Sequence, residues 1–415
     1  MKVLVLGTGG REHALVRSLS RDPTVTSVHC APGNAGTKLI AQNRPVEATD
    51  PAAVLALARE LAIDLVVVGP EAPLVAGVAD AVRAAGIACF GPTAAAAALE
   101  GSKAHAKDVM AAAGVPTAMA RVCESPGEVA GALDAFGPPF VVKDDGLASG
   151  KGVVVTSSRD TAGEHAAACG RVVIEEYLDG PELSVFALTD GVTVMPLQPA
   201  QDFKRALDAD EGPNTGGMGA YSPLPWAPPG LVNDVVDAVV QPMVDEMRRR
   251  GTPYQGLLYA GLALTSRGLR VVEFNARFGD PETQAVLARL ETPLGGVLRA
   301  AATGRLVDAE PLRWSRRAAV AVVVAAEGYP ASPAKGDVIE GLDGPDGAAE
   351  VPGAYVLHAG TARDDSGRLV SAGGRVLNVV GTGDTLPRAR AAAYEAAGRV
   401  RMRGMHYRGD IAAVG

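Results

Sequence analysis

Aromatic residues are scarce in this chain of 415 residues, and cysteine and histidine are rarer still. Phenylalanine, tryptophan and tyrosine together make up 4% of the sequence, so the core must consist mainly of aliphatic side chains. The four cysteines lie far apart without a Cys-x-x-Cys spacing, and the six histidines form no His-Glu-x-x-His motif. These absences argue against a disulfide-stabilised scaffold and against a zinc site.

The sequence also lacks an excess of positive charge and a long apolar run. Its net charge is −8, whereas binding to nucleic acid or to an anionic membrane requires a cationic surface. The apolar start, residues 2–6, runs into a glycine turn and has no cleavage site of a secretory signal. No segment reaches the roughly 18–20 continuous apolar residues of a membrane span. We therefore expect a cytoplasmic protein that binds neither nucleic acid nor membrane.

The overall composition is typical of a globular protein. Hydrophobic residues make up 47% of the chain and charged residues 21%, which leaves ample apolar surface to bury. A chain of this length is too long for one ordinary core, so two to four packed units are expected.

The first hundred residues alternate between short apolar runs and helical spacing. This alternation predicts a Rossmann-like parallel sheet covered on both faces by helices. Ligands of such sheets gather at the carboxyl ends of the strands, where the glycine-rich loops of this region fall. The predicted strands span 2–6, 25–30, 65–69 and 87–90, and the predicted helices span 12–20, 51–61 and 75–85.

After residue 101 the pattern changes to short strands with hairpin spacing, which predicts a multidomain protein with α/β and α+β parts. The hairpins comprise 183–188 with 193–198 and 257–265 with 269–275, and further strands span 140–143, 152–156, 171–176, 318–325, 355–359 and 376–380. Helices are expected at 103–113, 232–249 and 385–402. The resulting units are 1–101, 102–181, 182–317 and 318–415, the last a small α/β domain.

Two glycine-rich motifs resemble nucleotide-binding fingerprints and fail on inspection. Gly7-Thr-Gly-Gly10 would need glycine at position 12 to bind a dinucleotide, and that residue is Glu12. Gly146-Leu-Ala-Ser-Gly-Lys-Gly152 has too short a spacing for a Walker loop, and a glycine stands where Ser or Thr should hold magnesium. The second loop instead suits a lid whose backbone N–H groups close over phosphates, or a simple hairpin turn.

The stretch Val271-Val-Glu-Phe-Asn-Ala-Arg277 carries the strongest indication of a ligand site. In a strand, side chains two residues apart share a face, so Glu273 and Asn275 project together while Val272 and Phe274 face a core. A carboxylate and an amide oxygen suit Mg²⁺, which takes its other ligands from water and phosphate. Arg277, two residues further, is free to meet a carboxylate or a phosphate.

Two lysines precede this stretch at positions that favour phosphate binding. Lys143 ends an apolar strand next to the lid, and Lys103 begins a helix, whose N-terminus attracts anions. A surface position explains either lysine alone. Together, upstream of the lid, they fit charge neutralisation of a triphosphate.

These segments resemble the ATP-grasp ligases, and within them the phosphoribosylamine–glycine ligases. The resemblance covers essentially the whole chain. It rests on Gly7-Thr-Gly-Gly-Arg-Glu-His-Ala-Leu15, Ala31-Pro-Gly-Asn-Ala-Gly-Thr37, Lys143-Asp-Asp-Gly-Leu-Ala-Ser-Gly-Lys-Gly152, Gly212-Pro-Asn-Thr-Gly-Gly-Met-Gly-Ala-Tyr221, Glu273-Phe-Asn-Ala-Arg-Phe-Gly-Asp-Pro-Glu282 and His406-Tyr-Arg-Gly-Asp-Ile411.

The resemblance implies a role for each motif residue. ATP is expected at Lys103, Lys143, the lid residues Gly146, Ser149, Gly150, Lys151 and Gly152, and at Glu175, Glu176, Leu178 and Glu182. Mg²⁺ or Mn²⁺ is expected at Glu273 and Asn275. Asp202, Arg277 and Gly279 are implied to meet glycine, with Asn214, Thr215, Gly216, Gly217 and Met218 over the reacting centre. Gly9, Gly10, Asn34 and Glu71 are implied to meet phosphoribosylamine.

The family reaction joins glycine to 5-phospho-β-D-ribosylamine through a glycyl phosphate, with cleavage of ATP to ADP and phosphate, in the second step of purine synthesis. We expect a monomer or weak homo-oligomer, and no fused downstream enzyme because the chain ends soon after the closing motif. The chain departs from the family at Asp144, at Phe203 and in a shortened segment, 165–171.

Three other functions stay open at this point. Another ATP-grasp enzyme, such as a carboxylase, would share Lys143, the lid and Glu273. A regulatory nucleotide-binding module without catalysis would keep the fold. An NAD-dependent oxidoreductase is disfavoured by Glu12.

Overall fold

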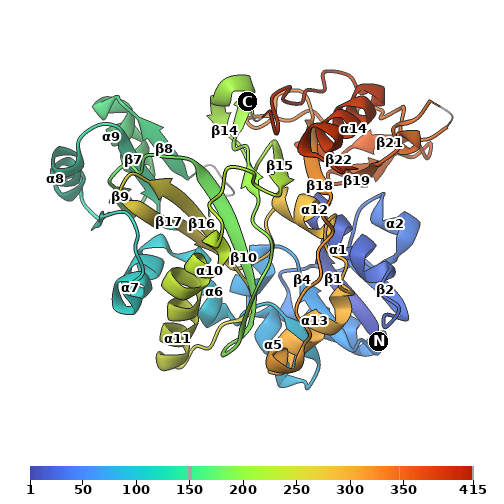
Figure 1. Ribbon diagram of the computed structural model, residues 1–415, viewed down its shortest axis with the longest axis horizontal. Coiled ribbons are helices and arrows are strands. Elements are labelled where there is room, and N and C mark those ends of the chain that lie inside the picture. The colour runs from blue at the N-terminus through green and yellow to red at the C-terminus, as the bar shows by residue number, and fades with distance from the viewer. Residues whose placement is uncertain (148–151, 345, 414–415) are drawn as a thin grey trace.

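The N-terminal part of the computed structural model is a parallel sheet with helices packed against it, as predicted (Figure 1). The structure describes residues 1–147, 152–344 and 346–413. The sheet has the order β3-β2-β1-β4-β5, in which every neighbouring pair is parallel. Its strands are β1 (Lys2–Gly7), β2 (Ser27–Pro32), β3 (Gln42–Asn43), β4 (Leu65–Val68) and β5 (Ala88–Phe90).

The order in which successive strands are added to the sheet reverses at β1, and this reversal positions the N-terminal loops. β2 pairs with one edge of β1 and β4 with the other, so the loops that leave β1 and β4 diverge from a common point. A crevice at the carboxyl ends of the strands beside such a reversal is the usual ligand site of an open α/β sheet. The predicted Rossmann-like sheet is therefore confirmed.

Helices of the N-terminal part match the predictions in two cases and differ in two. α1 (Gly10–Ser20) and α3 (Pro51–Glu60) agree, and α3 begins at Pro51 behind the capping carboxylate of Asp50. The helix predicted at 75–85 is wrong in its start, because Gly77 adopts φ +85° and separates α4 (Glu71–Val75) from α5 (Val78–Ala84). α2 (Thr37–Ile40) was not predicted.

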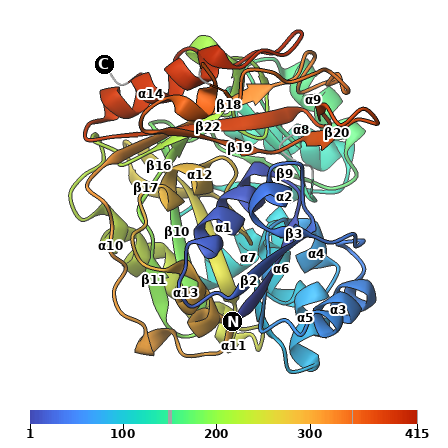
Figure 2. The same ribbon diagram turned by 90° about the vertical axis from the view of Figure 1, so that its right-hand side faces the viewer.

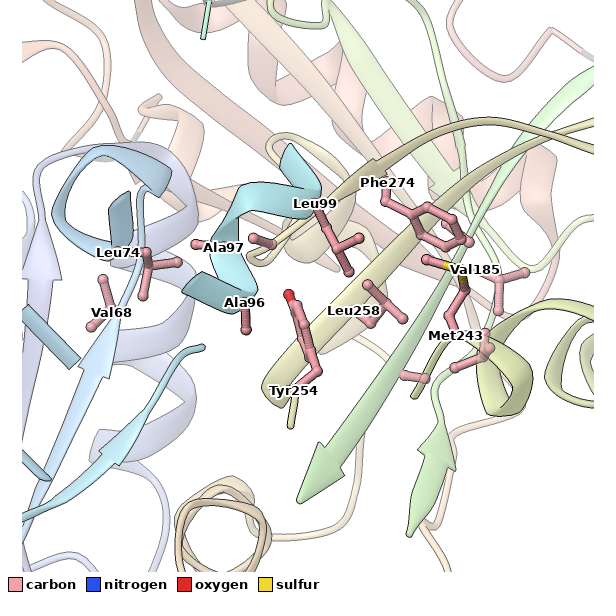
Figure 3. Packing of buried hydrophobic residues seen from close by; sticks show 14 of the residues in the cluster. Val68, Leu74, Ala96, Ala97, Leu99, Val185, Met243, Tyr254, Leu258 and Phe274 are labelled. Atoms are coloured by element: carbon pink, nitrogen blue, oxygen red, sulfur yellow. The ribbon is translucent and has the colours of Figure 1, made fainter. Parts of the chain in front are cut away.

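The alanine-rich helix α6 (Ala94–Gly101) was also not predicted, and it joins the N-terminal sheet to the centre of the molecule. Its small side chains let strands on both sides approach closely. Figure 3 shows Ala96, Ala97 and Leu99 of α6 between two apolar groups, Val68 and Leu74 on one side and Tyr254, Leu258 and Phe274 on the other. One apolar core therefore extends across the predicted boundary at residue 101.

Two antiparallel sheets form the centre. The first has the order β6-β9-β7-β8 and comprises β6 (Ala120–Cys123), β7 (Phe140–Asp144), β8 (Val153–Thr156) and β9 (Val172–Glu175), with α7 (Lys103–Ala113), α8 (Pro126–Phe136) and α9 (Arg159–Ala168) nearby. β7 and β8 pair antiparallel, which confirms the predicted hairpin. Lid residues Ser149, Gly150 and Lys151 lie outside the described residues.

The second central sheet has the order β11-β10-β16-β17. Its strands are β10 (Glu182–Asp190), β11 (Val194–Pro196), β16 (Gln255–Thr265) and β17 (Gly268–Asn275), which confirms both predicted hairpins. The helix predicted at 232–249 is divided into α10 (Leu231–Val235), a π-helical turn (Val236–Val240) and α11 (Gln241–Arg249). Pro242, in the first turn of α11, has no backbone N–H for a continuous α-helix, which accounts for the interruption.

The third sheet joins the centre of the chain to its C-terminal part. It has the order β12-β15-β18-β22-β19, and helix α14 (Leu386–Arg399) packs against it (Figure 2). Its strands are β12 (Gln201–Asp202), β15 (Gly219–Ser222), β18 (Ala318–Ala325), β19 (Ala354–His358) and β22 (Arg375–Gly383). β15 pairs with β18, so hydrogen bonds cross the predicted boundary at 317/318.

The remaining elements are short. They are α12 (Glu282–Leu287), α13 (Leu294–Ala302), β13 (Arg205–Leu207), β14 (Glu211–Asn214), β20 (Thr361–Arg363), β21 (Leu369–Ser371) and the 3-10 turns Asp208–Asp210, Leu306–Asp308 and Ala348–Glu350. Among the described residues, no helix is both long enough and apolar enough to cross a lipid bilayer.

Candidate active site

Lys143 connects the two central sheets. It lies near the end of β7 with a side chain that is 5% exposed, and its Nζ donates to the carbonyl oxygen of Val272 at 2.9 Å. The same Nζ lies 2.9 Å from Oε2 of Glu175 on β9. The predicted phosphate ligand is therefore held at the edge of β17 by one backbone and one carboxylate contact.

A second lysine, Lys107, shares the Glu175 carboxylate and was missed from the sequence. Its Nζ lies 3.0 Å from Oε1 of Glu175 and 2.8 Å from the hydroxyl of Thr117. The side chain of Glu175, expected at the adenine base, thus forms a buried ion pair with two lysines. Lys107 lies one helical turn after Lys103, and this spacing was the signal that could have indicated it.

Lys103 lies at the N-terminus of α7, against the base of the lid. Ser102 caps the helix by accepting from His105 N–H, and it donates to the Asp145 carboxylate at 3.0 Å. Asp145 also accepts from the backbone N–H of Ala104, so this carboxylate occupies the helix N-terminus that was predicted to attract phosphate. Lys103 Nζ donates to the carbonyl oxygen of Gly146 at 2.9 Å.

The segment expected to line the base and ribose follows β9. Glu176 is held by the N–H of Met119 at 3.0 Å and by Arg267 at 2.9 Å, and Leu178 is half-buried beyond it. Glu182, at the start of β10, pairs with Lys204 at 2.5 Å. The backbone of this segment, rather than its acidic side chains, is the part left for a nucleotide.

Glu273 and Asn275 lie on one face of β17, as predicted. They pair with Gly261 and Tyr259 of β16, and a bulge at Val272 interrupts the register just before them. The bulge corrects one expectation, because Val271 rather than Val272 is fully buried in the core with Phe274. It also places the carbonyl group of Val272 within reach of Lys143.

The charge of Glu273 is favoured by the cations around it. Burial alone would raise the pKa of this carboxyl, but Lys204, Lys143, Lys103 and Arg277 outweigh burial and lower it. Glu273 is therefore an anion at neutral pH. An ionised carboxylate is the form that binds a metal cation.

Arg277 is not free in this structure, in contrast to the expectation from the sequence. It lies 3.2 Å from Glu71 of the N-terminal part and 3.2 Å from Glu100 at the end of α6. Its Nη2 also approaches the Asn275 amide oxygen at 3.4 Å. Burial would lower the pKa of Arg277, but Glu100 and Glu71 outweigh it and raise the pKa. Glu100 was missed from the sequence.

Asp202 lies in an acidic cluster that Lys204 partly neutralises. Burial, with contributions from Glu282, Glu182 and Glu273, raises the pKa of Asp202 to about 7 despite the attraction of Lys204. Burial would lower the pKa of Lys204, yet Asp202 and Glu182 keep it well above its usual value.

The Glu282 carboxylate accepts from Tyr259 at 2.9 Å, and Gly279 packs against the same carboxylate, where a Cβ would lie 2.6 Å from it. Glu282 was not predicted as a site residue.

The segment from Asn214 to Met218 contacts three separate parts of the chain. Asn214 donates to the Val153 carbonyl at the start of β8, and Thr215 donates to the Lys204 carbonyl at 2.8 Å. Gly216 N–H donates to the hydroxyl of Tyr329 in the C-terminal part. Gly217 adopts φ +107°, and Met218 is fully buried.

The N-terminal glycine loop is shaped by Glu12. Its carboxylate accepts from Gly9 N–H at 2.6 Å and pairs with Arg11 at 2.5 Å, and its side chain is 2% exposed. A Cβ at Gly9 or at Gly69 would lie 2.8 or 2.1 Å from this carboxylate. The residue that excludes the dinucleotide fingerprint therefore fills the space beneath the loop, which explains why glycine stands at these positions.

Other predicted N-terminal residues contact the C-terminal part. A Cβ at Gly10 would lie 2.1 Å from the amide nitrogen of Asn378 on β22. Asn34 donates to the carbonyl groups of Thr8 and His358 and accepts from two backbone N–H groups of its own loop. Its side chain therefore holds the loop in shape.

Arg375 of β22 and Asp280 join the C-terminal part to the candidate site, and both were missed from the sequence. Arg375 donates to the Asp280 carbonyl at 2.6 Å and pairs with its carboxylate at 3.1 Å. Arg375 also donates to the carbonyl of Gly216. The C-terminal domain therefore reaches the segment expected over the reacting centre.

The oxygen donors of β17 fit a divalent cation that takes further ligands from phosphates. Glu273 and Asn275 share a face, and the first is ionised. Across the ranges 1–147, 152–344 and 346–413, no cluster of three or more His, Cys, Asp or Glu residues has the geometry of a complete metal site.

Two antiparallel sheets with lysines on one and a carboxylate–amide pair on the other, joined to an N-terminal parallel sheet, define an ATP-grasp ligase. The biotin carboxylase domain of the Hydrogenobacter thermophilus 2-oxoglutarate carboxylase, in complex with MgADP, ADP and bicarbonate, shares this fold. It has a TM-score of 0.73, is 18% identical, and covers 98% of this chain and 91% of its own.

Comparison of the sequence defines the family within that class. Models of the phosphoribosylglycinamide synthetase N domain, ATP-grasp (A) domain and C domain match residues 1–100, 101–283 and 319–414. The phosphoribosylamine–glycine ligase of Streptomyces coelicolor is 68% identical over 413 residues, 100% of this chain and 99% of the relative. The crystal structure of the Thermotoga maritima phosphoribosylamine–glycine ligase is 35% identical with a TM-score of 0.85, and covers 99% of this chain and 100% of its own.

The chain belongs to the phosphoribosylamine–glycine ligase family. The resemblance inferred from the motifs is thereby confirmed, and the chain is an ATP-dependent ligase. An NAD-dependent oxidoreductase and a carboxylase of the same superfamily are excluded by the same matches. The roles of individual residues stay predictions.

Proposed function

We propose that this ligase joins glycine to 5-phospho-β-D-ribosylamine, cleaves ATP to ADP and phosphate, and passes through a glycyl phosphate. The contact between Glu71 and Arg277 is the observation that carries this proposal. Glu71 is the residue expected to meet the ribosylamine, Arg277 the one expected to meet the glycine carboxylate, and their side chains lie 3.2 Å apart. The two predicted substrate sites are thus adjacent, as a reaction between an amine and an activated carboxylate requires.

The nucleotide would lie between the two central sheets. Lys103 and Lys143 would contact its phosphates, Gly146 and Gly152 would begin and end the lid, and the backbone of residues 175–178 would meet the base, with Glu182 on the ribose. Lid residues Ser149, Gly150 and Lys151 keep the role predicted from the sequence. The support is the position of both lysines beside Glu273 and at the base of the lid.

Glu273 and Asn275 would hold Mg²⁺ or Mn²⁺, which when bound supplies charge neutralisation at the phosphate oxygens. The protein's own cations share this task, because Lys204, Lys143 and Lys103 all act on the same face. Little acid–base catalysis is needed, since the glycine carboxylate is already a nucleophile.

Glycine would be bound by Arg277, Asp202 and Gly279, with the segment Asn214–Met218 over the reacting centre. Arg277 must then exchange at least one of its two carboxylate partners for glycine. Gly9, Gly10, Asn34 and Glu71 would meet the ribosylamine, with Asn34 acting mainly through the loop it holds. Exclusion of water by the lid protects the glycyl phosphate from hydrolysis.

Substitution of Glu273 tests the nucleotide site. We expect Glu273→Ala to lower ADP release in the presence of glycine and phosphoribosylamine by about 100-fold or more, because a fixed charge at the reacting phosphate is lost. Glu60→Ala, on an exposed position at the end of α3, is the matched control and should keep full activity. Thermal unfolding checks that both variants are folded.

Near-normal turnover of folded Glu273→Ala would disprove the metal and phosphate assignment. Dependence of ADP release on both glycine and phosphoribosylamine tests the substrates separately, and a regulatory nucleotide-binding module would show no such release. For the active enzyme we propose a cytoplasmic location and a monomer or weak homo-oligomer. Sedimentation of the purified protein would check the oligomeric state.

A further inference from the structure

A groove runs along the joint between the N-terminal and C-terminal domains, beside the loop that Asn34 holds. α1 and α2 form one wall, and β19 with residues 339–343 forms the other. Figure 2 shows α1 and α2 next to β19. Its volume is about 650 Å³, within the usual range for sites that bind small organic molecules. None of the residues that line it was assigned above to ATP, glycine or phosphoribosylamine.

Two arginines line this groove, Arg17 of α1 and Arg21 directly after its end. Arg17 and Arg21 lie one helical turn apart, and the Arg17 guanidinium stacks on the ring of Tyr355 from β19, 3.6 Å from its centre. The same three residues also line a smaller adjoining hollow of about 180 Å³. The stacked pair therefore forms a rigid cationic wall that two hollows share.

Within the described part of the chain, neither Arg17 nor Arg21 of this wall forms an ion pair, although four acids line the two hollows. Burial lowers the pKa of Arg17, Tyr355 opposes this, and Arg21 lowers it further by repulsion.

Of the acids at the two hollows, Asp22 accepts hydrogen bonds from Thr24 and from the Gly295 N–H group. Glu291 lies at the smaller hollow, Glu340 and Asp343 lie on the opposite wall, and Asp343 acts on His358.

The remainder of the groove is apolar in part. Leu39 and Ile40 of α2 are 69% and 43% exposed, although side chains of this kind are usually buried. Leu342 and Val356 line the other wall. A ligand that fits must therefore combine an anionic group for the arginines with an organic part for the apolar surface.

We propose that this groove binds an organic phosphate of about the size of a nucleoside monophosphate. Its phosphate contacts Arg17 and Arg21, because planar guanidinium groups match phosphate oxygens. Its flat or apolar part lies against Tyr355, Leu39 and Ile40. The bound molecule bridges the N-terminal and C-terminal domains next to the contact between His13 and His358, which line the same groove.

Calorimetric titration with uridine monophosphate tests the site. The enzyme is first saturated with ADP, magnesium and glycine, so that the nucleotide site is filled. We expect saturable binding to the unmodified enzyme and binding weaker by about tenfold or more in the double variant Arg17→Gln, Arg21→Gln. Arg59→Gln, an exposed arginine of α3 outside the groove, is the matched control and should bind normally.

Uridine and inorganic phosphate separate the two parts of the ligand. Weak binding of both supports the proposal, whereas inorganic phosphate that binds as tightly as uridine monophosphate overturns the organic class. The proposal is also overturned if uridine monophosphate does not bind, or if the double variant, folded and releasing ADP at the normal rate, binds it as tightly. A dimer that the double variant abolishes would make the groove a contact between two copies, and would equally overturn it.

Discussion

Glu175 lies between Lys107 and Lys143, and this arrangement limits what its side chain can do for a nucleotide. Both of its oxygens are engaged at 3.0 and 2.9 Å, and the carboxylate is 3% exposed. Removing one partner of a buried carboxylate is costly because the remaining charge is poorly solvated. The side chain of Glu175 therefore positions Lys143, and its backbone is the part left to meet the base, as predicted for this segment.

Lys107→Met tests this role. We expect the free energy of unfolding to fall by roughly 1–3 kcal/mol, because Glu175 loses one of two cations. The KM for ATP should rise as Glu175 draws Lys143 closer, and kcat should change less. Urea unfolding and steady-state kinetics measure the two effects.

The double variant Lys107→Met, Glu175→Gln is the control for charge. It removes the unpaired carboxylate, so most of the lost stability should return. If the double variant is as unstable as Lys107→Met, the loss comes from packing of the lysine stem, and the electrostatic account is wrong.

At the scale of the element, the N-terminus of α7 links the phosphate-binding lysine to the lid. Ser102 caps the helix and also holds Asp145, whose neighbour Gly146 accepts from Lys103. The helix was predicted with its observed bounds, Lys103–Ala113, because a cap and helical spacing are local signals. Its connection to residues 145–146 was not predictable from those signals.

Ser102→Ala should therefore affect both stability and nucleotide binding. We expect a loss of about 1 kcal/mol from the missing cap, together with a higher KM for ATP because Asp145 and Gly146 are released. Ser125→Ala removes the cap of α8, which also accepts from a backbone N–H three residues later, and lies away from the lysines. It should cost similar stability and leave the KM unchanged. An equal rise in KM in both variants would contradict the proposed link.

Strand β17 shows how far an element can be predicted. Strand alternation correctly placed Glu273 and Asn275 on one face, because side-chain direction follows from backbone geometry within a few residues. The bulge at Val272 was not visible in the sequence, since it depends on the register with β16. The same limit applies to α6, whose alanines carry little periodicity of their own and become a helix buried between two sheets.

At the scale of the whole molecule, His13 of α1 and His358 of β19 join the N-terminal and C-terminal domains. The backbone N–H of His358 donates to His13 Nδ1 at 2.8 Å. Burial, followed by repulsion from His358 and Arg17, lowers the pKa of His13 to about 3. Burial also lowers the pKa of His358 to about 4, with Asp343 opposing and Arg363 adding to the shift.

The sign of the resulting pH dependence follows from these two values. Between about pH 3 and 6.5 the unfolded chain binds more protons at these positions than the folded protein, so stability falls as the pH falls. Each histidine contributes up to roughly 1.4 kcal/mol per pH unit between its pKa in the folded protein, about 3 for His13 and about 4 for His358, and its usual value. Denaturant unfolding at several pH values measures the slope, and His13→Gln should reduce it. An unchanged slope in that variant would show that other groups control acid stability.

Local patterns were enough to predict the family, the Rossmann-like sheet, the central hairpins and the shared face of Glu273 and Asn275. Each of these depends on periodicity or on motif spacing, which short stretches of chain carry on their own. The partner of each charged group depends instead on the tertiary structure. Arg277 meets Glu71 across 206 positions, and Lys143 meets the Val272 carbonyl across 129. Such pairings depend on how sheets pack against one another, and no local pattern encodes that packing.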